Sequence, residues 1–324
     1  MSAFVGIDVG GTKVAAAALR GGELSEALVR PTIRSSSAAL IDELVELVNT
    51  VRGEDAAAVG IGVPSVVEFA TGRIRFSVNI PLANLPLRQI LSDRIGLPVF
   101  VENDASCAAL AEALDGDRIT SENLVMFTIG TGVGGGLVLN GRLYRGATGA
   151  APEMGHIIIG MDLRNGPPPP LPRPPQHGTL ERLAAGTELD RLARRTAERY
   201  PDSALGRILT ERSGVIGKDA VDAAKSGDEA ALEAVRMLGR RLGIGVANAI
   251  NLFDPNEVVI GGGVSSAGGL LLDPVREVAA QYTLPGVGTE TTIRLARRGP
   301  EAGLLGAAQL AKMELEREWE TETP

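Results

Sequence analysis

Residues 97–114 read L-P-V-F-V-E-N-D-A-S-C-A-A-L-A-E-A-L, and this stretch decides the fold class. A β-branched and aromatic run over Val99–Val101 stops at the polar triplet Glu102-Asn103-Asp104, and an alanine-rich helical pattern follows. The pattern predicts a strand that ends in carboxylates directly before a helix. Ligands of α/β proteins gather at such points, because the strand ends open into a crevice and the first helical turn has free N–H groups. A helix cap made by Asn103 or Asp104 is the simpler interpretation, and both stay open at this point.

The bulk composition describes an ordinary globular chain. It has 324 residues, 44% hydrophobic and 22% charged, which is enough for two domains and a large core. The net charge of −8 disfavours nucleic acid as a partner, because such binding neutralises phosphates with Lys and Arg. The single cysteine, Cys107, allows no internal disulfide and suits a reducing compartment. With no membrane-length apolar run and no signal-like start, we expect a cytoplasmic protein that has no membrane partner.

A glycine turn follows the first predicted strand. Phe4–Val9 is apolar and leads into D-V-G-G-T-K (residues 8–13), and Val14–Leu19 reads as a second strand. Two glycines in this setting let the backbone approach a ligand closely, and consecutive N–H groups make a nest for an anion. Asp8 would point into the same space, where it could hold hydrated Mg²⁺. The Walker spacing is absent, and an ordinary Gly-Gly hairpin is the alternative.

The first third of the chain predicts a mixed sheet. Helices are expected over Ser37–Arg52 and Leu87–Ile95, with a buried strand at Ala58–Val63 and a polar, Pro- and Gly-marked segment at 66–86. The order β-β-β-α-β-α-β-α indicates a meander of first strands, followed by strands joined through helices.

The pattern of strand, glycine turn and strand then occurs again. Leu124–Ile129 reads as a strand that ends in G-T-G-V-G-G-G (residues 130–136), and the next strand ends in a hairpin turn at Asn140-Gly141. A dinucleotide fingerprint needs a helix after the glycines, so that interpretation is excluded. The repeat predicts a duplicated architecture with two phosphate-cradling turns.

A proline-rich loop separates the second start from the helical remainder. Seven prolines within residues 167–175 exclude a helix and a central strand there. Of the two histidines, His177 is expected to be a solvated loop residue, whereas a functional and a structural role both stay open for His156.

The last part of the chain predicts long helices and a third glycine turn. A strand at Glu257–Ile260 leads into Gly261-Gly262-Gly263, which suits either close approach by a ligand or a plain strand–helix turn. The helices are expected over Thr187–Arg199, Glu229–Leu252 and Glu301–Glu318.

Two phosphate turns, a third glycine turn and an aspartate at a strand end are together the parts of a phosphoryl-transfer site. In this order the sequence resembles the ROK family of sugar kinases and repressors, and within it the glucokinase-like members. The resemblance rests on D-V-G-G-T-K (8–13), V-E-N-D-A (101–105), G-T-G-V-G-G-G (130–136), G-A-x-G-x-x-P-E-M-G-H (146–156) and G-G-G-V (261–264).

The resemblance implies an actin-like (RNase H-like) α/β fold, with two duplicated domains and a cleft between them. The smaller domain would comprise residues 1–117 and 300–324, and the larger one residues 118–299. It also implies a homodimer that phosphorylates the 6-hydroxyl of a hexose, with glucose favoured, using ATP and Mg²⁺.

The same resemblance assigns roles to individual residues. Asp104 would be the general base that takes the proton of the sugar 6-hydroxyl as it attacks the γ-phosphate, a role that demands mainly correct positioning. Asp8 would orient Mg²⁺ through water. The implied sugar-binding residues are Asn79, Asn103, Asp104, Glu153, His156 and Glu181. The implied nucleotide-binding residues are Asp8, Gly10, Gly11, Thr12, Lys13, Thr131, Gly132, Gly261, Gly262 and Gly263.

Three departures from the family pattern limit the assignment. Most members carry a zinc site made of a histidine and three cysteines, whereas Thr179 stands in place of the last cysteine, so no zinc is expected. We expect the proline run to stiffen that loop instead. Ser65 stands in place of a usual glycine, and Leu82-Ala83 lack a usual aromatic.

The departures leave fructose, mannose, N-acetylglucosamine and N-acetylmannosamine as alternative substrates, and polyphosphate as an alternative donor. A sugar-sensing repressor would need a DNA-reading domain before the first strand, which begins at Phe4. An intact Asp104 and both phosphate turns argue against a non-catalytic sugar-binding module.

Overall fold

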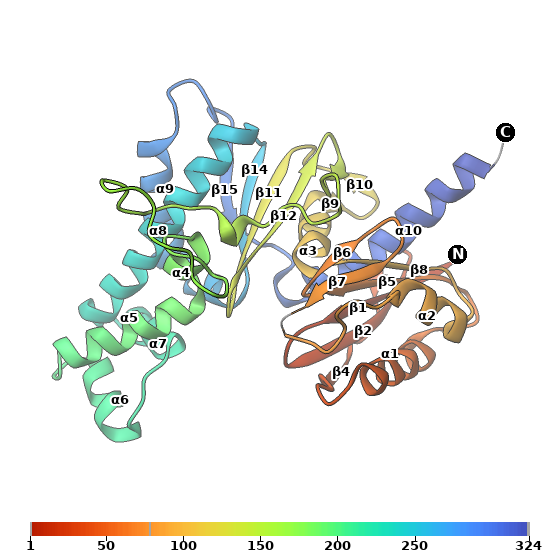
Figure 1. Ribbon diagram of the computed structural model, residues 1–324, viewed down its shortest axis with the longest axis horizontal. Coiled ribbons are helices and arrows are strands. Elements are labelled where there is room, and N and C mark those ends of the chain that lie inside the picture. Colours follow the sequence, from red (N-terminus) through yellow and green to blue (C-terminus); the bar gives the residue numbers. More distant parts are fainter. Residues whose placement is uncertain (1, 78, 323–324) are drawn as a thin grey trace. The chain divides into compact units, whose positions relative to one another are not determined.

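The computed structural model describes residues 2–77 and 79–322. The chain divides into two compact units, each built from strands and helices (Figure 1). The first unit consists of Met1–Glu122, Gly136–Pro152 and Arg298–Pro324, and the second of Asn123–Gly135 and Glu153–Arg297. The domain boundaries 1–117 with 300–324, and 118–299, stay a prediction. The units differ from them chiefly in residues 136–152, which return to the first unit.

The first unit is built on a six-stranded mixed sheet. β1 and β2 form an antiparallel hairpin, while β1, β5 and β8 run parallel, so the carboxyl ends of these three strands share one edge. The sequence predicted this mixed sheet. The strand order is β3-β2-β1-β5-β8 with β4 on β2. Their bounds are β1 (Ala3–Val9), β2 (Lys13–Arg20), β3 (Glu23–Leu24), β4 (Leu28–Pro31), β5 (Ala56–Val63) and β8 (Val99–Asn103).

Helices cover both faces of this sheet. Val5 and Ile7 lie in one buried cluster and Phe4 in another, because successive strand residues point to opposite faces. Each fully buried leucine in these clusters contributes about 1.5–3 kcal/mol. The helices are α1 (Ser37–Val51) and α2 (Leu87–Ile95) in the first cluster, and α3 (Asp104–Ala113) and α10 (Ala302–Glu322) in the second.

Glycines allow α10 to lie close to its neighbours. A Cβ at Gly60 in β5 would overlap the carbonyl oxygen of Ala307, and one at Gly306 would overlap that of Cys107 in α3. No larger residue fits at these contacts, so they fix the last helix against the sheet and against α3.

Residues 66–86 contain a hairpin that the sequence did not predict. β6 (Ser65–Glu68) and β7 (Arg73–Ser77) pair in antiparallel register, with Gly72 at a positive φ of 63° in the turn. The strands are four and five residues long, too short for the alternation of apolar residues to stand out. A second short hairpin joins β9 (Leu114–Asp115) and β10 (Arg118–Ile119).

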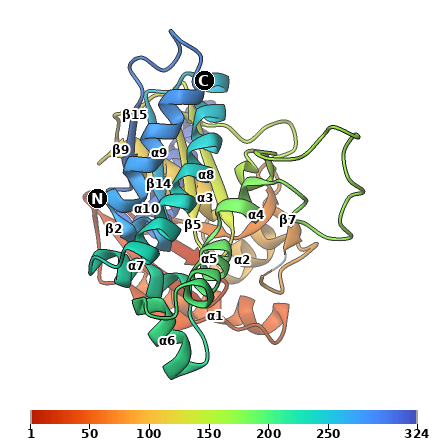
Figure 2. The ribbon, with the colours of Figure 1, turned by 90° about the vertical axis from the view of Figure 1, so that its left-hand side faces the viewer.

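The second unit contains parallel strands, with the helical part of the chain around them. β11 pairs with β14, and β14 with β15, so their carboxyl ends also share an edge. The long helices α8 and α9 pack side by side, as Figures 1 and 2 show. Its strands are β11 (Leu124–Ile129), β14 (Glu257–Gly261) and β15 (Thr292–Leu295). Its helices are α4 (Leu180–Ala184), α5 (Gly186–Arg199), α6 (Ala204–Arg212), α7 (Gly217–Lys225), α8 (Glu229–Phe253) and α9 (Gly269–Tyr282).

The chain passes between the units within β12 (Val133–Leu139), which enters the first unit at Gly136. There β12 forms a hairpin with β13 (Arg142–Leu143) through Asn140 and Gly141, whose φ angles of 52° and 72° confirm the predicted turn. Short 3₁₀ helices occupy Met154–His156, Gly263–Ala267 and Gly299–Glu301. Within the described residues, none of the helices combines the length and apolarity that a membrane span requires.

Candidate active site

The first predicted phosphate turn, Gly10–Lys13, is the hairpin turn between β1 and β2 in the first unit. The Gly10 N–H donates to the Lys13 carbonyl at 2.8 Å, which joins β1 to β2. Thr32, just after β4, holds the turn from the other side, because its hydroxyl donates to the Gly10 carbonyl at 2.7 Å and its N–H to Thr12 at 3.0 Å. The turn is therefore fixed by the neighbouring strand and does not depend on a ligand for its shape.

Asn79 lies beside this turn. A Cβ at Gly11 would be 3.6 Å from the Cβ of Asn79, whose side chain is exposed. The structure thus brings this predicted sugar residue to the predicted phosphate turn.

Asp8 and Asp104 lie at the same edge of the sheet. Asp8 of β1 pairs with Gly62 of β5, and Gly62 pairs with Glu102 of β8, two residues before Asp104. A Cβ at Gly62 would be 3.4 Å from the Cα of Asp104, so this glycine lets the start of α3 lie against β5. Parallel pairing therefore brings together two carboxylates that are far apart in sequence.

Asn103 is both the helix cap and a candidate ligand. Its Oδ1 accepts the N–H groups of Ala105 at 2.9 Å and Ser106 at 3.2 Å, as a cap of α3 does. Its Nδ2 donates to the Ser65 carbonyl at 3.5 Å. Asn103 Oδ1 therefore caps α3, as the simpler interpretation predicted. Asn103 Nδ2 makes only the long hydrogen bond to Ser65.

Asp104 is held in one orientation by the same helix start. Its Oδ1 accepts the Ala105 N–H at 2.9 Å, and the N–H of Asp104 itself also stabilises the carboxylate. Within residues 2–77 and 79–322, no other residue donates a hydrogen bond to its Oδ2. Burial raises the pKa of this carboxyl above its ordinary value, and the bond from Ala105 opposes the shift only in part. One carboxylate oxygen is therefore positioned by the backbone and the other is left for a ligand.

The pKa of Asp8 is raised as well. Burial and then the negative charge of Asp104 raise its pKa from 3.8 to about 7, against the opposing charge of Lys13. The first turn of α10 also approaches this carboxyl, since a Cβ at Gly303 would be 2.9 Å from its Cγ. The carboxylates of Asp8 and Asp104 lie near each other, and the exposed Lys13 supplies a positive charge near Asp8. Two neighbouring carboxylates of this kind favour a bound cation.

The second predicted phosphate turn is fixed by contacts within the second unit. The Gly130 N–H donates to the Gly132 carbonyl at 3.0 Å, and the Gly186 N–H at the start of α5 donates to the Gly130 carbonyl at 2.8 Å. Glu181 of α4 accepts the Val133 N–H at 2.9 Å. Thr131 at the tip is exposed. A predicted sugar residue, Glu181, is thus directly bonded to the predicted phosphate turn.

Glu153 precedes, and His156 ends, the short 3₁₀ helix that packs on this turn. Both side chains are about half exposed, at 51% and 42%, and His156 Nε2 is 3.9 Å from Glu153 Oε2. A Cβ at Gly155 would overlap the Val133 carbonyl and would be 3.3 Å from the Cβ of Glu181. The structure therefore brings Glu153, His156 and Glu181 together in the second unit.

The third glycine turn lies at the neighbouring strand end. Gly261 pairs with Thr128, and Gly262 has a φ of 83° with its Cβ position 2.5 Å from the Ile129 carbonyl. Only glycine fits there. Gly263 has no atom within 4 Å of its Cβ position, so one face of this turn is open.

Glu102 and Arg145 form a buried ion pair to which the sequence analysis assigned no role. Arg145 Nε is 2.5 Å from Glu102 Oε2. Glu102 directly precedes Asn103 and Asp104 in the sequence. The arginine is distant in sequence, and no local pattern marks it as the partner of Glu102.

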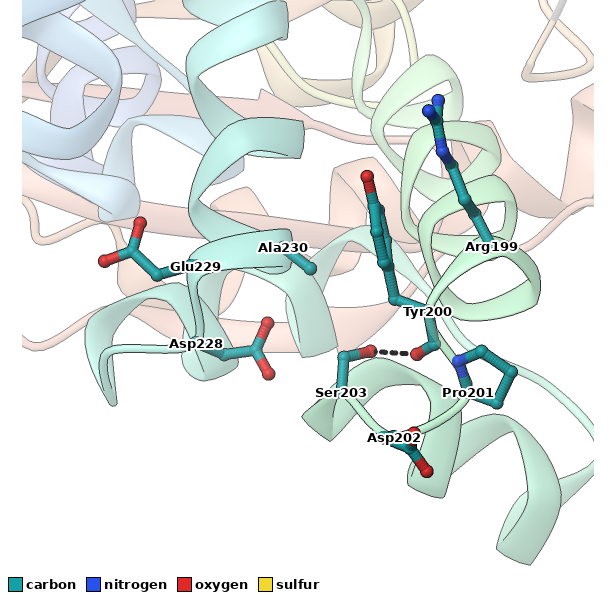
Figure 3. A pocket seen from close by; sticks show the side chains of 8 residues that line it. All are labelled: Arg199, Tyr200, Pro201, Asp202, Ser203, Asp228, Glu229 and Ala230. Atoms are coloured by element: carbon teal, nitrogen blue, oxygen red, sulfur yellow. Dashed lines mark hydrogen bonds between the residues drawn. The ribbon is translucent and has the colours of Figure 1, made fainter.

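The structure also contains a cavity of about 420 Å³ between the end of α5 and the starts of α6 and α8, drawn in Figure 3. No predicted site residue lines it. Its Asp228 carboxylate accepts the N–H groups of Ala231 and Ala204, so that it caps α8 and holds the start of α6. We assign this cavity no role in the reaction.

The absence of zinc from the loop between His156 and Glu181 stays a prediction. The only cysteine is Cys107, buried in α3, and the described part of the chain contains no group of three or more His, Cys, Asp or Glu suited to a metal. The Gln176 side chain instead forms a two-bond pair with the backbone of Leu171, at 2.6 and 3.0 Å. Thr179 donates to the Gln176 carbonyl at 3.0 Å and caps α4. Figure 2 shows this loop extending away from α4.

Comparisons with known proteins agree with the motifs. A family model described as ROK family matches residues 4–314. The chain is 35% identical to the glucokinase of Halalkalibacterium halodurans, over 96% of this chain and 95% of that protein. It is 34% identical to the N-acetyl-D-glucosamine kinase of Escherichia coli O127:H6, over 95% and 98% respectively. The crystal structure of a ROK family glucokinase from Streptomyces griseus in complex with glucose and AMPPNP matches with a TM-score of 0.81 and 34% identity, over 96% of this chain and 100% of that one.

Proposed function

The chain belongs to the ROK family, and from this premise we propose that it is an ATP-dependent kinase acting on the 6-hydroxyl of a hexose, with glucose as the favoured substrate. The observation that carries the proposal is the arrangement of Asp104, which has one oxygen bound to the start of α3 and the other left for a ligand. The glucokinase relatives, similar over nearly the whole chain, support glucose and ATP as substrates.

Asp104 acts as the general base. It accepts the proton of the sugar 6-hydroxyl, the hydroxyl oxygen attacks the γ-phosphorus, and the bond to the β-phosphate oxygen breaks to release ADP. The raised pKa of Asp104 makes it a better proton acceptor than an exposed aspartate. Because the transition state is loose, correct placement of the hydroxyl contributes more than basicity.

The glycine turns bind the nucleotide. Backbone N–H groups of Gly11 and Thr12 and of Thr131-Gly132 bind phosphate oxygens, while the Gly10 N–H closes the first turn on the Lys13 carbonyl. The Lys13 ammonium adds a positive charge. The open face of Gly261–Gly263 accommodates the adenosine. Asp8 would hold the Mg²⁺ that accompanies ATP, through water. Its carboxylate is buried and lies near the negative charge of Asp104, so a cation would stabilise its charged form. The ion would also neutralise charge on the phosphates.

The sugar is bound by amide, carboxylate and imidazole side chains, which are the groups that recognise the hydroxyls of a polyol. Asn79 and Asn103 supply amides, and Glu153, His156 and Glu181 supply acceptors for hydroxyl groups. Glu181 uses one oxygen on Val133 and has a second for the sugar, which joins sugar binding to the phosphate turn. Each hydroxyl removed from water must find such a partner, so the set determines which hexose is accepted.

An N-acetylhexosamine is the second candidate substrate, because a relative of 34% identity is an N-acetyl-D-glucosamine kinase. The test is a coupled ADP-release assay with MgATP against glucose, fructose, mannose, N-acetylglucosamine and N-acetylmannosamine, repeated with polyphosphate as donor. We expect the highest kcat/KM with glucose and ATP. Preference for another sugar keeps the mechanism and replaces the substrate, whereas no turnover with any of them contradicts the proposed function.

A homodimer is part of the same proposal and rests on the family alone. Size-exclusion chromatography with light scattering tests it, and a monomer at assay concentrations would contradict it.

A further inference from the structure

One ion-pair network in the first unit, centred on the buried Glu102 and the 18% exposed Arg145, lies immediately beside the proposed base. The Glu102 side chain is 2% exposed and uses both oxygens: Oε2 binds Arg145 Nε at 2.5 Å, and Oε1 accepts the N–H of Asn103 at 2.8 Å. Arg145 Nη2 binds Glu314 of α10 at 3.0 Å. The guanidinium also lies over the ring of Phe69, 3.5 Å from its centroid.

Arginine is the side chain that this arrangement requires. Its rigid fork donates through Nε to one carboxylate and through Nη2 to another, while its flat face stacks on an aromatic ring. Lysine carries the same charge, but a single ammonium cannot reproduce both directions and the stacking. The network therefore depends on geometry as well as on charge.

Arg145 belongs to residues 136–152, which are part of the first unit and pack closely on β6. Its carbonyl accepts the Ala151 N–H at 3.1 Å, which closes the loop, and a Cβ at Gly149 would overlap the Val67 carbonyl of β6. The same β6 strand supplies the Ser65 carbonyl that accepts from Asn103 Nδ2. Asn103 is thus held at its backbone through Glu102 and at its side chain through β6.

The burial of Glu102 makes its ion pair with Arg145 necessary for keeping the carboxylate charged. Removal from water raises the pKa of Glu102, and the charge and hydrogen bond of Arg145 oppose the rise. Without the arginine, a buried carboxylate would be left without its counter-ion, and it would take up a proton or turn towards water. Either change alters the acceptor of the Asn103 N–H.

We propose that Arg145 is a positioning residue for the phosphoryl transfer: through Glu102 it fixes the backbone at Asn103, so that the Asn103 amide and the Asp104 carboxylate keep one orientation towards the sugar. This inference rests on the proposed function, because it takes its meaning from the roles given there to Asn103 and Asp104. Arg145 touches neither substrate in this scheme and acts through Glu102.

The test uses the full-length protein and compares Arg145→Met, Arg145→Lys and Glu102→Gln with the double variant Glu102→Gln/Arg145→Met. The sugar is glucose, or whichever hexose the substrate panel selects. For Arg145→Met we expect kcat to fall about 100-fold and KM for the sugar to rise, since a displacement of about 1 Å at a reacting group costs that much. KM for MgATP should stay within about twofold, because the hydrogen bonds and ion pairs described for the network involve neither glycine turn. Arg145→Lys should recover part of the lost kcat.

The double variant separates positioning from simple loss of stability. If Arg145 acts through Glu102, the double variant is no slower than Arg145→Met alone, and the two losses are not additive. Glu314→Gln is the matched control, because it weakens the outer half of the network and should leave kcat within about threefold. Melting temperatures of all variants are measured in parallel, and kinetics are recorded well below them.

Two results would overturn the inference: a folded Arg145→Met with kcat and sugar KM close to wild type, or additive losses in the double variant. Should Arg145→Met fail to fold, Glu102→Gln and Arg145→Lys decide, and wild-type kinetics in both would equally overturn it. Asp104→Asn serves as the reference for the proposed function. If that variant stays active, the assignment of the base fails whatever Arg145 does; if it is inactive while Arg145→Met is normal, only the present inference fails. If the wild type turns over no hexose, the proposed function falls and this inference with it.

Discussion

Glu181 accepts a hydrogen bond from the Val133 N–H at 2.9 Å, which ties α4 to the glycine turn at the end of β11. Gly132 makes this contact feasible, because a Cβ there would overlap the same carboxylate oxygen. The residue assigned to the sugar by sequence motif therefore also shapes the turn assigned to the nucleotide. Substitutions at Glu181 can separate these two roles.

We predict different kinetic effects for two variants of this residue. Glu181→Gln keeps a carbonyl oxygen that can accept from Val133, so KM for the sugar should rise while KM for MgATP stays near wild type. Glu181→Ala leaves the Val133 N–H without its acceptor, which costs about 1–3 kcal/mol of stability where the group stays buried, and both KM values should rise. Steady-state kinetics in both substrates and urea denaturation measure these effects. Equal kinetic changes in the two variants would show that the hydrogen bond to Val133 has no role in nucleotide binding.

The raised pKa of Asp8 predicts a pH-dependent stability in the absence of ligands. A carboxyl with a pKa of about 7 in the folded chain keeps its proton where the unfolded chain, at about 3.8, has lost it. Its contribution to stability is thus fully present below the lower value and is lost as the pH rises through about 7. The shift corresponds to at most about 4 kcal/mol. Asp8→Asn removes this titration, so the variant should gain stability relative to wild type between pH 5 and pH 8.

Urea denaturation of wild type and Asp8→Asn across that range, without nucleotide or Mg²⁺, measures the difference. Asp55→Asn is the control, because Arg20 holds the pKa of that exposed carboxyl below its ordinary value and its titration has the opposite sign. Parallel stability curves for wild type and Asp8→Asn would contradict the prediction.

Local signals were sufficient to predict the elements that carry the proposed site. The change at Val101–Glu102 from apolar to polar residues placed the junction of β8 and α3 to within two residues, since β8 continues to Asn103 and α3 begins at Asp104. The glycine turns at Gly10 and Gly130 were predicted for the same reason, because each interrupts an apolar strand. ROK family membership and the α/β fold of its sugar kinases followed from the order of these motifs.

Long-range partners left no such signal. Arg145 meets Glu102 only because residues 136–152 return to the first unit, and nothing near Arg145 in the sequence indicates that return. Thr32, which supports the Gly10 turn, is likewise an ordinary polar residue in the sequence. Ser65 was noted as a departure from the family pattern, but its contact with Asn103 was not predicted. The β6–β7 hairpin was missed because its strands are short and partly polar.

Asp104→Asn should abolish most of the turnover and leave sugar binding intact. The amide has nearly the shape of the carboxylate and can still accept the Ala105 N–H, but it cannot take the hydroxyl proton. Loss of a general base lowers kcat by about 10²–10⁴-fold. Calorimetric titration with the sugar should give a Kd within about threefold of wild type, which shows that the fold is preserved. A kcat within tenfold of wild type would remove Asp104 from the role of base.

Gln176 should order the loop between His156 and Glu181 without a metal. The side-chain amide of Gln176 forms two hydrogen bonds with the Leu171 backbone. The backbone carbonyl of Gln176 accepts a hydrogen bond from the hydroxyl of Thr179, two residues before Glu181. Gln176→Ala removes the side-chain pair, so the loop should become more sensitive to proteolysis and KM for the sugar should rise several-fold, with kcat at saturation changed less. Arg173→Ala, in the same exposed loop, is the matched control and should behave as wild type. Treatment with a chelator, followed by its removal and by addition of Mg²⁺, should leave activity unchanged. Stoichiometric zinc in the purified protein, or activity restored only by zinc, would show that a metal orders this loop.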